Sequence, residues 1–179
     1  SWASAKGSDP CSSSYGMTSC REGRIAQPLG DGLYLIDTGY VRPGLAASHL
    51  LVDQGRAAFI DTGPGPAAPR LLSALDELGV AREQVDYLFL THVHLDHAGG
   101  AGQMMRALPN ARAVLHPRGA PHLVDPSKLI AGTIAVYGEA AYRQLYGELL
   151  PIPADRVLLM ADGMRLQLGA RTFEFIDAP

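Results

Sequence analysis

The stretch THVHLDHAGG, residues 91–100, carries most of the information in this chain. Within six of its positions it holds three of the chain's six histidines and one aspartate: His92, His94, Asp96 and His97. Neutral imidazole nitrogens and carboxylate oxygens suit Zn²⁺ as ligands, and also Fe²⁺ or Mn²⁺. A chance cluster on a solvated loop is the alternative explanation, and it fits a single histidine far better than three so close together. We therefore predict a metal site in this stretch.

The flanking residues indicate how such a site would be built. The apolar run VDYLFL (85–90) directly before it predicts a strand buried on both faces. In an extended segment beyond that strand, residues 92, 94 and 96 would point the same way. His97 would then follow at the start of the next helix. The small residues AGG (98–100) let the backbone turn without crowding the site.

Strands and helices alternate along the rest of the chain. A hairpin is expected at 49–63 with its turn at 53–55, and a helix with Leu71, Leu72, Leu75 and Leu78 on one face is closed by Gly79. Further strands are expected at 32–39, 111–117, 157–160, 164–168 and 171–177, and a further helix at 98–108. This order predicts an α/β fold of packed layers.

Residues 118–156 differ in character from their surroundings. The pattern TIAVYGEAAYRQLYGELL (133–150) predicts an amphipathic helix that carries Tyr137, Tyr142 and Tyr146. These tyrosines either line an apolar pocket or pack at helical spacing as ordinary core residues, and the sequence leaves both open.

Composition and charge limit the classes of function that the chain can have. The chain has 179 residues, 47% of them hydrophobic, and a formal net charge of −3, which predicts one globular domain without a broad basic face for nucleic acid. The longest apolar runs are far shorter than the roughly 20 residues that span a bilayer. We expect a small-molecule substrate, no nucleic-acid or membrane partner, and a cytoplasmic location, although the start at Ser1 leaves export open.

The first 23 residues are rich in serine and glycine and show no apolar period. We expect residues 1–23 to form a flexible tail. Both cysteines, Cys11 and Cys20, lie in it, and we favour two free thiols over a local disulfide.

The motif HxHxDH in THVHLDHAGG resembles the metallo-β-lactamase superfamily of metal-dependent hydrolases, in particular its glyoxalase II-like members. The likeness runs from about Gly32 to Pro179, and "FIDTG" around Asp61 adds to it. It implies an αββα sandwich formed by residues 24–179, with residues 118–156 as a helical insertion on the substrate side. It also implies one or two Zn²⁺ ions, with Fe²⁺ or Mn²⁺ as alternatives. The first ion would be bound by His92 and His94 and the second by Asp96 and His97, with Asp61 hydrogen-bonded to a ligand imidazole.

The sequence departs from the family pattern at its end. The family takes a third histidine from a "GH" just after a strand, but this chain ends in FIDAP (175–179). We therefore expect the missing ligands and most of the second half of the sandwich to lie beyond Pro179. An isolated chain of this kind should be marginally stable and prone to self-association. His49, His116 and His122 are candidates to replace the missing ligands.

The resemblance implies that a metal-activated water attacks an ester-like bond in a thioester, a lactone or a β-lactam. Asp96 would orient that water and carry its proton. Two alternatives stay open: an iron dioxygenase built on the same motif, and a catalytically inert truncated product.

Overall fold

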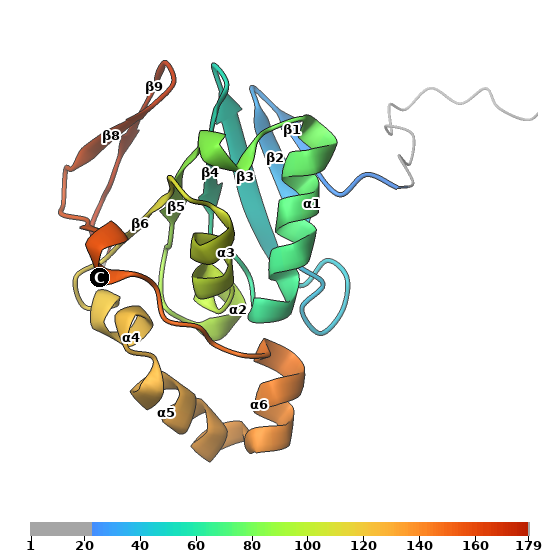
Figure 1. Ribbon diagram of the computed structural model, residues 1–179, viewed down its shortest axis with the longest axis vertical. Helices are drawn as coiled ribbons and strands as arrows, with labels where there is room; N and C mark the ends of the chain where they lie inside the picture. The colour runs from blue at the N-terminus through green and yellow to red at the C-terminus, as the bar shows by residue number, and fades with distance from the viewer. Residues whose placement is uncertain (1–22, 179) are drawn as a thin grey trace, which may run out of the picture.

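A computed structural model describes residues 23–178 of the chain (Figure 1). The elements follow one another as β1 (Gln27–Gly30), β2 (Leu33–Asp37), β3 (Ala47–Asp53), β4 (Arg56–Ile60), η1 (Gly65–Ala67), α1 (Ala68–Leu78), η2 (Arg82–Gln84), β5 (Val85–Phe89), α2 (Leu95–Ala98), α3 (Ala101–Ala107), β6 (Arg112–Leu115), α4 (Ala120–Val124), α5 (Ser127–Tyr137), α6 (Glu139–Tyr146), η3 (Ala154–Arg156), β7 (Val157–Leu159), β8 (Arg165–Leu168) and β9 (Arg171–Glu174).

Seven strands form one sheet in sequence order, from β1 to β7. The pairs from β1 to β4 are antiparallel, whereas β4, β5, β6 and β7 are parallel neighbours. It follows that β2, β4, β5, β6 and β7 all run in one direction and end at the same edge. The loops that follow these five strands therefore meet there, at the edge where α/β sheets commonly bind ligands.

One face of the sheet is covered by α1 and α3 (Figure 1). Alternate residues of β4 point to this face, and Phe59 lies in a core with Leu71 and Leu75 of α1 and Met104 of α3. Gly79 ends α1 in the left-handed conformation at φ 66°, which confirms the expected stop.

The β8–β9 hairpin covers part of the other face. Leu168 of β8 is fully buried in a second core with Ala58, Phe89 and Val114 of the large sheet. Helices, the seven-stranded sheet and the two-stranded β8–β9 sheet thus lie in successive layers, in agreement with the predicted α/β sandwich. Of the three strands expected at 157–160, 164–168 and 171–177, the last two pair with each other as β8 and β9, whereas the first, β7, joins β6 in parallel.

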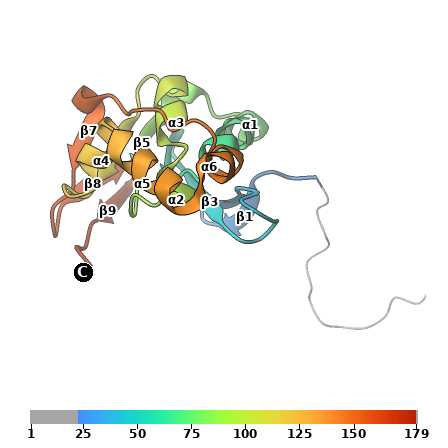
Figure 2. The same ribbon diagram turned by 90° about the horizontal axis from the view of Figure 1, so that it is seen from below.

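The region 118–156 holds α4, α5 and α6, which lie together beyond the edge at which α2 begins (Figures 1 and 2). The single amphipathic helix expected there is wrong. Gly138, with φ 81° and ψ 156°, ends α5 and starts α6, because glycine adopts a backbone conformation that L residues rarely tolerate. The helix expected at 98–108 is present as α3, which begins only at Ala101, after Gly99 and Gly100.

Strand β1 was not predicted from the sequence. All four of its residues are exposed, and Pro28 fits an edge strand because it removes one backbone donor. Most of the expected tail 1–23, including Cys11 and Cys20, lies outside the described residues. Within the described part of the chain, no helix has the length and apolar content to span a bilayer.

Candidate metal centre

Asp61 is the first residue after β4, at the shared edge of the sheet. Its backbone is left-handed, with φ 57°, a conformation that costs free energy for a residue other than glycine. Two contacts hold it: its N–H donates to the carbonyl of Phe89 (2.8 Å), and its carbonyl accepts from the hydroxyl of Ser48 (2.8 Å). The side chain is thereby directed from the end of β4 toward the loop after β5.

Thr91 of that loop is the main partner of Asp61. The backbone N–H of Thr91 donates to Asp61 Oδ1 at 2.9 Å, and its hydroxyl lies 3.0 Å from Oδ1 and 2.8 Å from Oδ2. An ionised carboxylate only accepts hydrogen bonds, so the single hydroxyl proton of Thr91 goes to Asp61.

This assignment fixes the tautomer of His92. Nδ1 of His92 lies 2.9 Å from the hydroxyl oxygen of Thr91, whose proton is already donated to Asp61. The imidazole Nδ1–H therefore donates, and the lone pair is left on Nε2. Burial first, and then His97 and His94, lower the pKa of His92, which favours the neutral ring that a metal ion needs.

His97 is oriented by the same carboxylate. Its Nδ1 lies 2.9 Å from Asp61 Oδ2, so its Nε2 is also free to accept or to bind a metal. Its carbonyl accepts from the backbone N–H of Thr62 at 2.7 Å, which ties the first turn after β5 to the loop after β4. Asp61 thus orients two imidazoles: that of His97 by direct contact, and that of His92 through the hydroxyl of Thr91.

His94 and Asp96 lie beside this pair. The ring of His94 is 4.7 Å from that of His92, and Asp96 Oδ2 is 3.6 Å from Nε2 of His97. The expectation of one extended segment through residue 96 is wrong, because α2 begins at Leu95. Residues 92, 94 and 96 therefore do not alternate along one strand. The helical turn instead places Asp96 beside His97.

The donor atoms fit a divalent cation. Ligand atoms of Asp61, His92 and His97 all lie within 4.8 Å of one another, and no other described residues form such a group of three. Free Nε2 atoms beside carboxylates are the donor set of zinc and iron sites. This grouping includes Asp61, for which we expected only a contact with a ligand imidazole. The ligand roles of His94 and Asp96 stay predictions.

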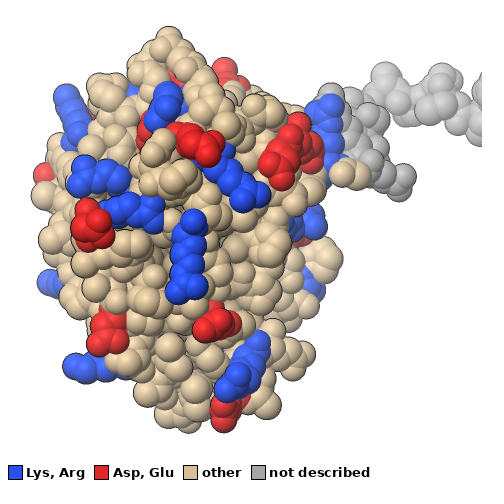
Figure 3. All heavy atoms as spheres, in the orientation of Figure 1, with Lys and Arg blue, Asp and Glu red and all other residues tan. Residues whose placement is uncertain are grey.

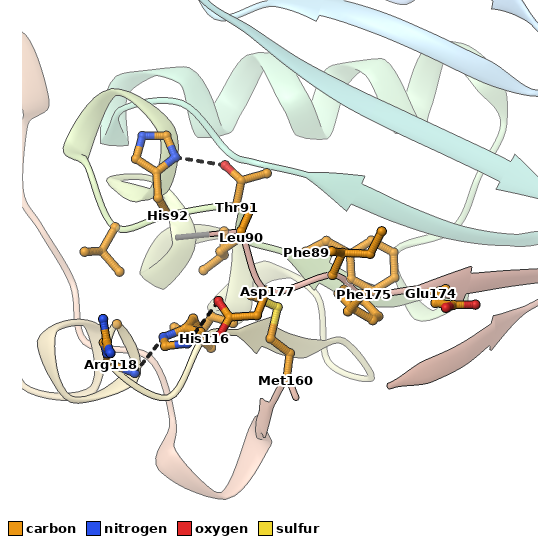
Figure 4. A pocket seen from close by; sticks show the side chains of 15 residues that line it. Phe89, Leu90, Thr91, His92, His116, Arg118, Met160, Glu174, Phe175 and Asp177 are labelled. Carbon is orange, nitrogen blue, oxygen red and sulfur yellow. Dashed lines mark hydrogen bonds and ion pairs between the residues drawn. The ribbon is translucent and has the colours of Figure 1, made fainter. Parts of the chain in front are cut away.

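A cavity of about 590 Å³ opens next to His92 (Figure 4). Its walls come from the ends of β5 and β6 and from the segment after β9, and they include His116, Arg118 and Asp177. Nε2 of His116 is 3.6 Å from Asp177 Oδ1, and its Nδ1 accepts from the N–H of Arg118. Of the three histidines considered as replacement ligands, His116 alone lines this cavity, while His122 is exposed on α4 and His49 lies within β3.

Sequence inspection missed Thr91 as a site residue. Its position between the apolar run and His92 could have indicated this role, because a hydroxyl there can contact both a carboxylate and an imidazole.

Comparisons with known proteins agree with this geometry. A family model described as the metallo-beta-lactamase superfamily matches residues 41–174. A hydroxyacylglutathione hydrolase of Salmonella paratyphi A is 37% identical over 91 residues, which are 49% of this chain and 32% of that protein. The chain thus matches about a third of the length of this relative.

Solved structures show the same fold. A B3 metallo-β-lactamase with an active-site glutamic acid superposes with a TM-score of 0.60 at 24% identity, over 83% of this chain and 50% of that one. A metallo-β-lactamase of Cronobacter sakazakii with a HARLDQ motif gives a TM-score of 0.61 at 22% identity, over 85% and 52%.

Proposed function

Because the chain belongs to the metallo-β-lactamase superfamily, we propose that it is a metal-dependent hydrolase of an ester-like bond. The observation that carries the proposal is the contact of Asp61 with both Thr91 and His97, which leaves Nε2 free on His92 and His97. We assign Zn²⁺, as one or two ions, to the cluster of His92, His94, Asp96 and His97.

Each residue has a defined task in this reaction. His92, His94 and His97 would hold the ion through ring nitrogens, and Asp61 keeps the rings of His92 and His97 oriented. When bound, the ion lowers the pKa of a water to about 7 and polarises the substrate carbonyl. The carboxylate of Asp96, which is about one-third exposed, would accept the proton of the attacking water and pass it to the leaving group.

A thioester is the preferred substrate class, ahead of a lactone or a β-lactam. The Salmonella relative is a hydroxyacylglutathione hydrolase, and its name describes the hydrolysis of an acylated thiol. The solved neighbours are β-lactamases, but their identities of 24% and 22% support only the fold.

A small molecule is a better candidate substrate than a nucleic acid. Lysine, arginine, aspartate and glutamate are interspersed on the face shown in Figure 3, without a broad basic patch there. A phosphate backbone is bound chiefly through such patches.

Metal analysis combined with a substrate panel tests the proposal. Purified protein is assayed for bound zinc, iron and manganese, and then for hydrolysis of an acyl thioester, a lactone and a β-lactam. The double variant His92→Ala/His94→Ala should lose both metal and activity, whereas His122→Ala, an exposed histidine on α4, should keep both. Equal metal content in the wild type and the double variant would refute the site. Iron accompanied by oxygen uptake would favour the dioxygenase alternative.

A further inference from the structure

The cavity beside His92 has an apolar base that belongs to the two cores of the molecule. Leu90 and Leu115 lie in the core beneath α1 and α3, and Met160 and Phe175 pack against the core beneath the β8–β9 hairpin (Figure 4). The volume of about 590 Å³ falls within the usual range of small-molecule sites. Because packing fixes these walls, the cavity offers a defined apolar surface to a ligand.

The turn after β6, residues 116–119, forms one rim of this cavity and touches the metal-binding loop. A Cβ added at Gly119 would lie 2.6 Å from Cγ1 of Val93. The backbone of the turn therefore packs directly on the residue between His92 and His94, and Val93 and Gly119 both line the cavity. A ligand that extends from the metal centre into the cavity thus lies against this turn.

His116 holds the turn in place. Its Nδ1 accepts from the backbone N–H of Arg118 at 3.1 Å, so the neutral ring carries its proton on Nε2, which lies 3.6 Å from Asp177 Oδ1. The N–H of Asp177 in turn donates to Asp162 Oδ1 at 3.1 Å. Both ring nitrogens of His116 are thus directed at protein groups. This arrangement argues against His116 as a replacement metal ligand and makes it a support for Arg118.

Arg118 supplies the positive charge of the cavity. Besides histidines, three acidic or basic side chains line it: Arg118, Glu174 and Asp177. Glu174 pairs with Arg165 at 2.7 Å, and Asp177 faces His116. Within the described part of the chain, the side chain of Arg118 makes no ion pair and no hydrogen bond. The rim therefore offers one guanidinium group to a ligand that enters the cavity.

The tyrosines of α6 lie outside this cavity. Tyr142 and Tyr146 are buried in a separate small core, and the hydroxyl of Tyr146 lies 3.0 Å from that of Tyr40. Of the two roles that the sequence left open for them, these two tyrosines therefore have that of core residues. The charged residue that the region 118–156 adds to the cavity is Arg118.

We propose that this cavity binds a part of the substrate that consists of an aliphatic chain ending in a carboxylate, with Arg118 as the residue that selects the carboxylate. A guanidinium group pairs with a carboxylate through two parallel hydrogen bonds. A phosphate, with its higher charge, fits less well beside the carboxylates of Glu174 and Asp177. The inference rests on the proposed function and narrows its substrate class to thioesters with a terminal carboxylate.

Substrate selectivity tests the proposal. The metal-loaded protein is assayed with neutral S-hexanoyl-N-acetylcysteamine, with S-adipoyl-N-acetylcysteamine, whose carboxylate ends the acyl chain, and with the hexanoyl thioester of 4-mercaptobutanoate, whose carboxylate is on the thiol. One of the two carboxylated substrates should have a KM about tenfold or more below that of the neutral one, as expected for a hydrogen bond to a charged group. The favoured substrate tells whether the cavity holds the acyl group or the leaving thiol. Absence of any such preference would overturn the proposal.

Arg118→Gln should abolish the preference, because it raises KM for the favoured substrate about ten- to hundredfold. The loss should appear in KM rather than kcat, since Arg118 does not touch the bond that breaks. Arg118→Lys keeps the charge and should recover part of the preference.

Arg112→Gln is the matched control. Arg112 is exposed at the start of β6, at the opposite end of the same strand, and its replacement removes the same charge from the protein. This variant should keep the full preference. Equal losses in Arg112→Gln and Arg118→Gln would overturn the role of Arg118, because the preference would then follow the overall charge of the protein.

Ile176→Asp tests the cavity wall without opening a core cavity, because Ile176 lines the cavity and is 75% exposed. A carboxylate there would repel the carboxylate of the ligand and wet the surface that its chain contacts. KM for the favoured substrate should therefore rise about tenfold or more. Leu159→Asp, at a residue that is 53% exposed and outside the cavity wall, should leave it unchanged. An unchanged KM in Ile176→Asp would overturn the proposal.

Binding measurements separate this inference from the proposed function. If the wild type hydrolyses no thioester, the proposed function fails, but the cavity remains testable by calorimetric titration. Straight-chain dicarboxylates from succinate to suberate are compared with monocarboxylates of the same length. Each pair shares one carboxylate, so the difference in affinity reports the second one. Tighter binding of a dicarboxylate that Arg118→Gln abolishes would support the site. Equal affinities throughout the series, or a difference that Arg118→Gln leaves unchanged, would overturn it.

Discussion

Oδ2 of Asp61 lies 2.9 Å from Nδ1 of His97 and 2.8 Å from the hydroxyl of Thr91, which in turn contacts Nδ1 of His92. His92 comes from the loop after β5, His97 from the following α2, and Asp61 from the end of β4, and the parallel pairing of β4 with β5 brings these segments together. The orientation of the two imidazoles is therefore set by Asp61 and Thr91, which lie outside the HxHxDH motif, as well as by the motif itself.

Asp61→Asn should weaken metal binding about 10- to 100-fold, as the loss of an orienting carboxylate usually does. The amide removes a charge and an acceptor from the contact with Thr91 and His97. Competition with a chromophoric chelator measures the affinity. Asp86→Asn is the control, since Asp86 pairs with Arg56 near the start of β5, away from the cluster. Unchanged affinity in Asp61→Asn would contradict the orienting role.

Thr91→Val should also weaken metal binding, by a smaller factor of about 3 to 30. Valine keeps the shape of threonine but cannot link Asp61 to His92, so His92 loses its fixed tautomer. Thr133→Val, which removes a hydroxyl bonded to the Leu129 carbonyl within α5, should leave the affinity unchanged. The same chelator assay applies, and equal affinities for the two variants would exclude the link through Thr91.

Asp96→Ala should reduce hydrolysis by two or more orders of magnitude, as expected when a general base is removed. Its melting temperature should change little, because Asp96 is partly exposed on α2 and its loss opens no core cavity. Asp155→Ala, an exposed aspartate in η3, serves as the control for both measurements. An active Asp96→Ala protein would refute the proton-transfer role.

The regular elements could be predicted because their patterns are local. The β3–β4 hairpin, α1 with its stop at Gly79, and β5 each follow from apolar periodicity and turn residues within a dozen positions. β1 could not be predicted in this way, since an exposed edge strand has no apolar face to reveal it.

The site was only partly predictable for the same reason. The cluster of three histidines is visible in six residues, but the contact between Tyr40 and Tyr146 spans 106 positions. Contact between these two residues depends on how the fold positions the loop after β2 relative to α6, and no local pattern in the sequence specifies that. The break at Gly138 was missed because the apolar spacing continues across it, whereas a single glycine with a positive φ redirects the chain.

Gly102→Ala should destabilise the protein, although alanine normally favours a helix by about 1 kcal/mol. A Cβ at Gly102 in α3 would lie 2.1 Å from the backbone carbonyl oxygen of Leu150, so the segment after α6 would have to move. Gly132→Ala in α5 meets nothing within 4 Å and should be neutral or stabilising. Denaturant unfolding measures both, and a stabilising Gly102→Ala would show that this segment does not pack on α3 in solution.

Leu168→Ala tests whether the β8–β9 hairpin covers the large sheet in solution. Leu168 is 0% exposed and packs against Leu51, Phe89 and Val114, so truncating it leaves a cavity between the two sheets. The loss should be about 2–5 kcal/mol of the free energy of unfolding, the usual range for a buried leucine.

Leu159→Ala in β7 is the matched control, because Leu159 is 53% exposed and its truncation should cost less than about 1 kcal/mol. Both variants are unfolded in urea, with the slope of the transition compared to that of the wild type. A large loss in Leu168→Ala at unchanged slope means that the hairpin packs as part of one cooperative unit. If the two variants lose equally little, the hairpin is detached in solution, and the sheet face bearing Phe89 and Val114 is left open for self-association.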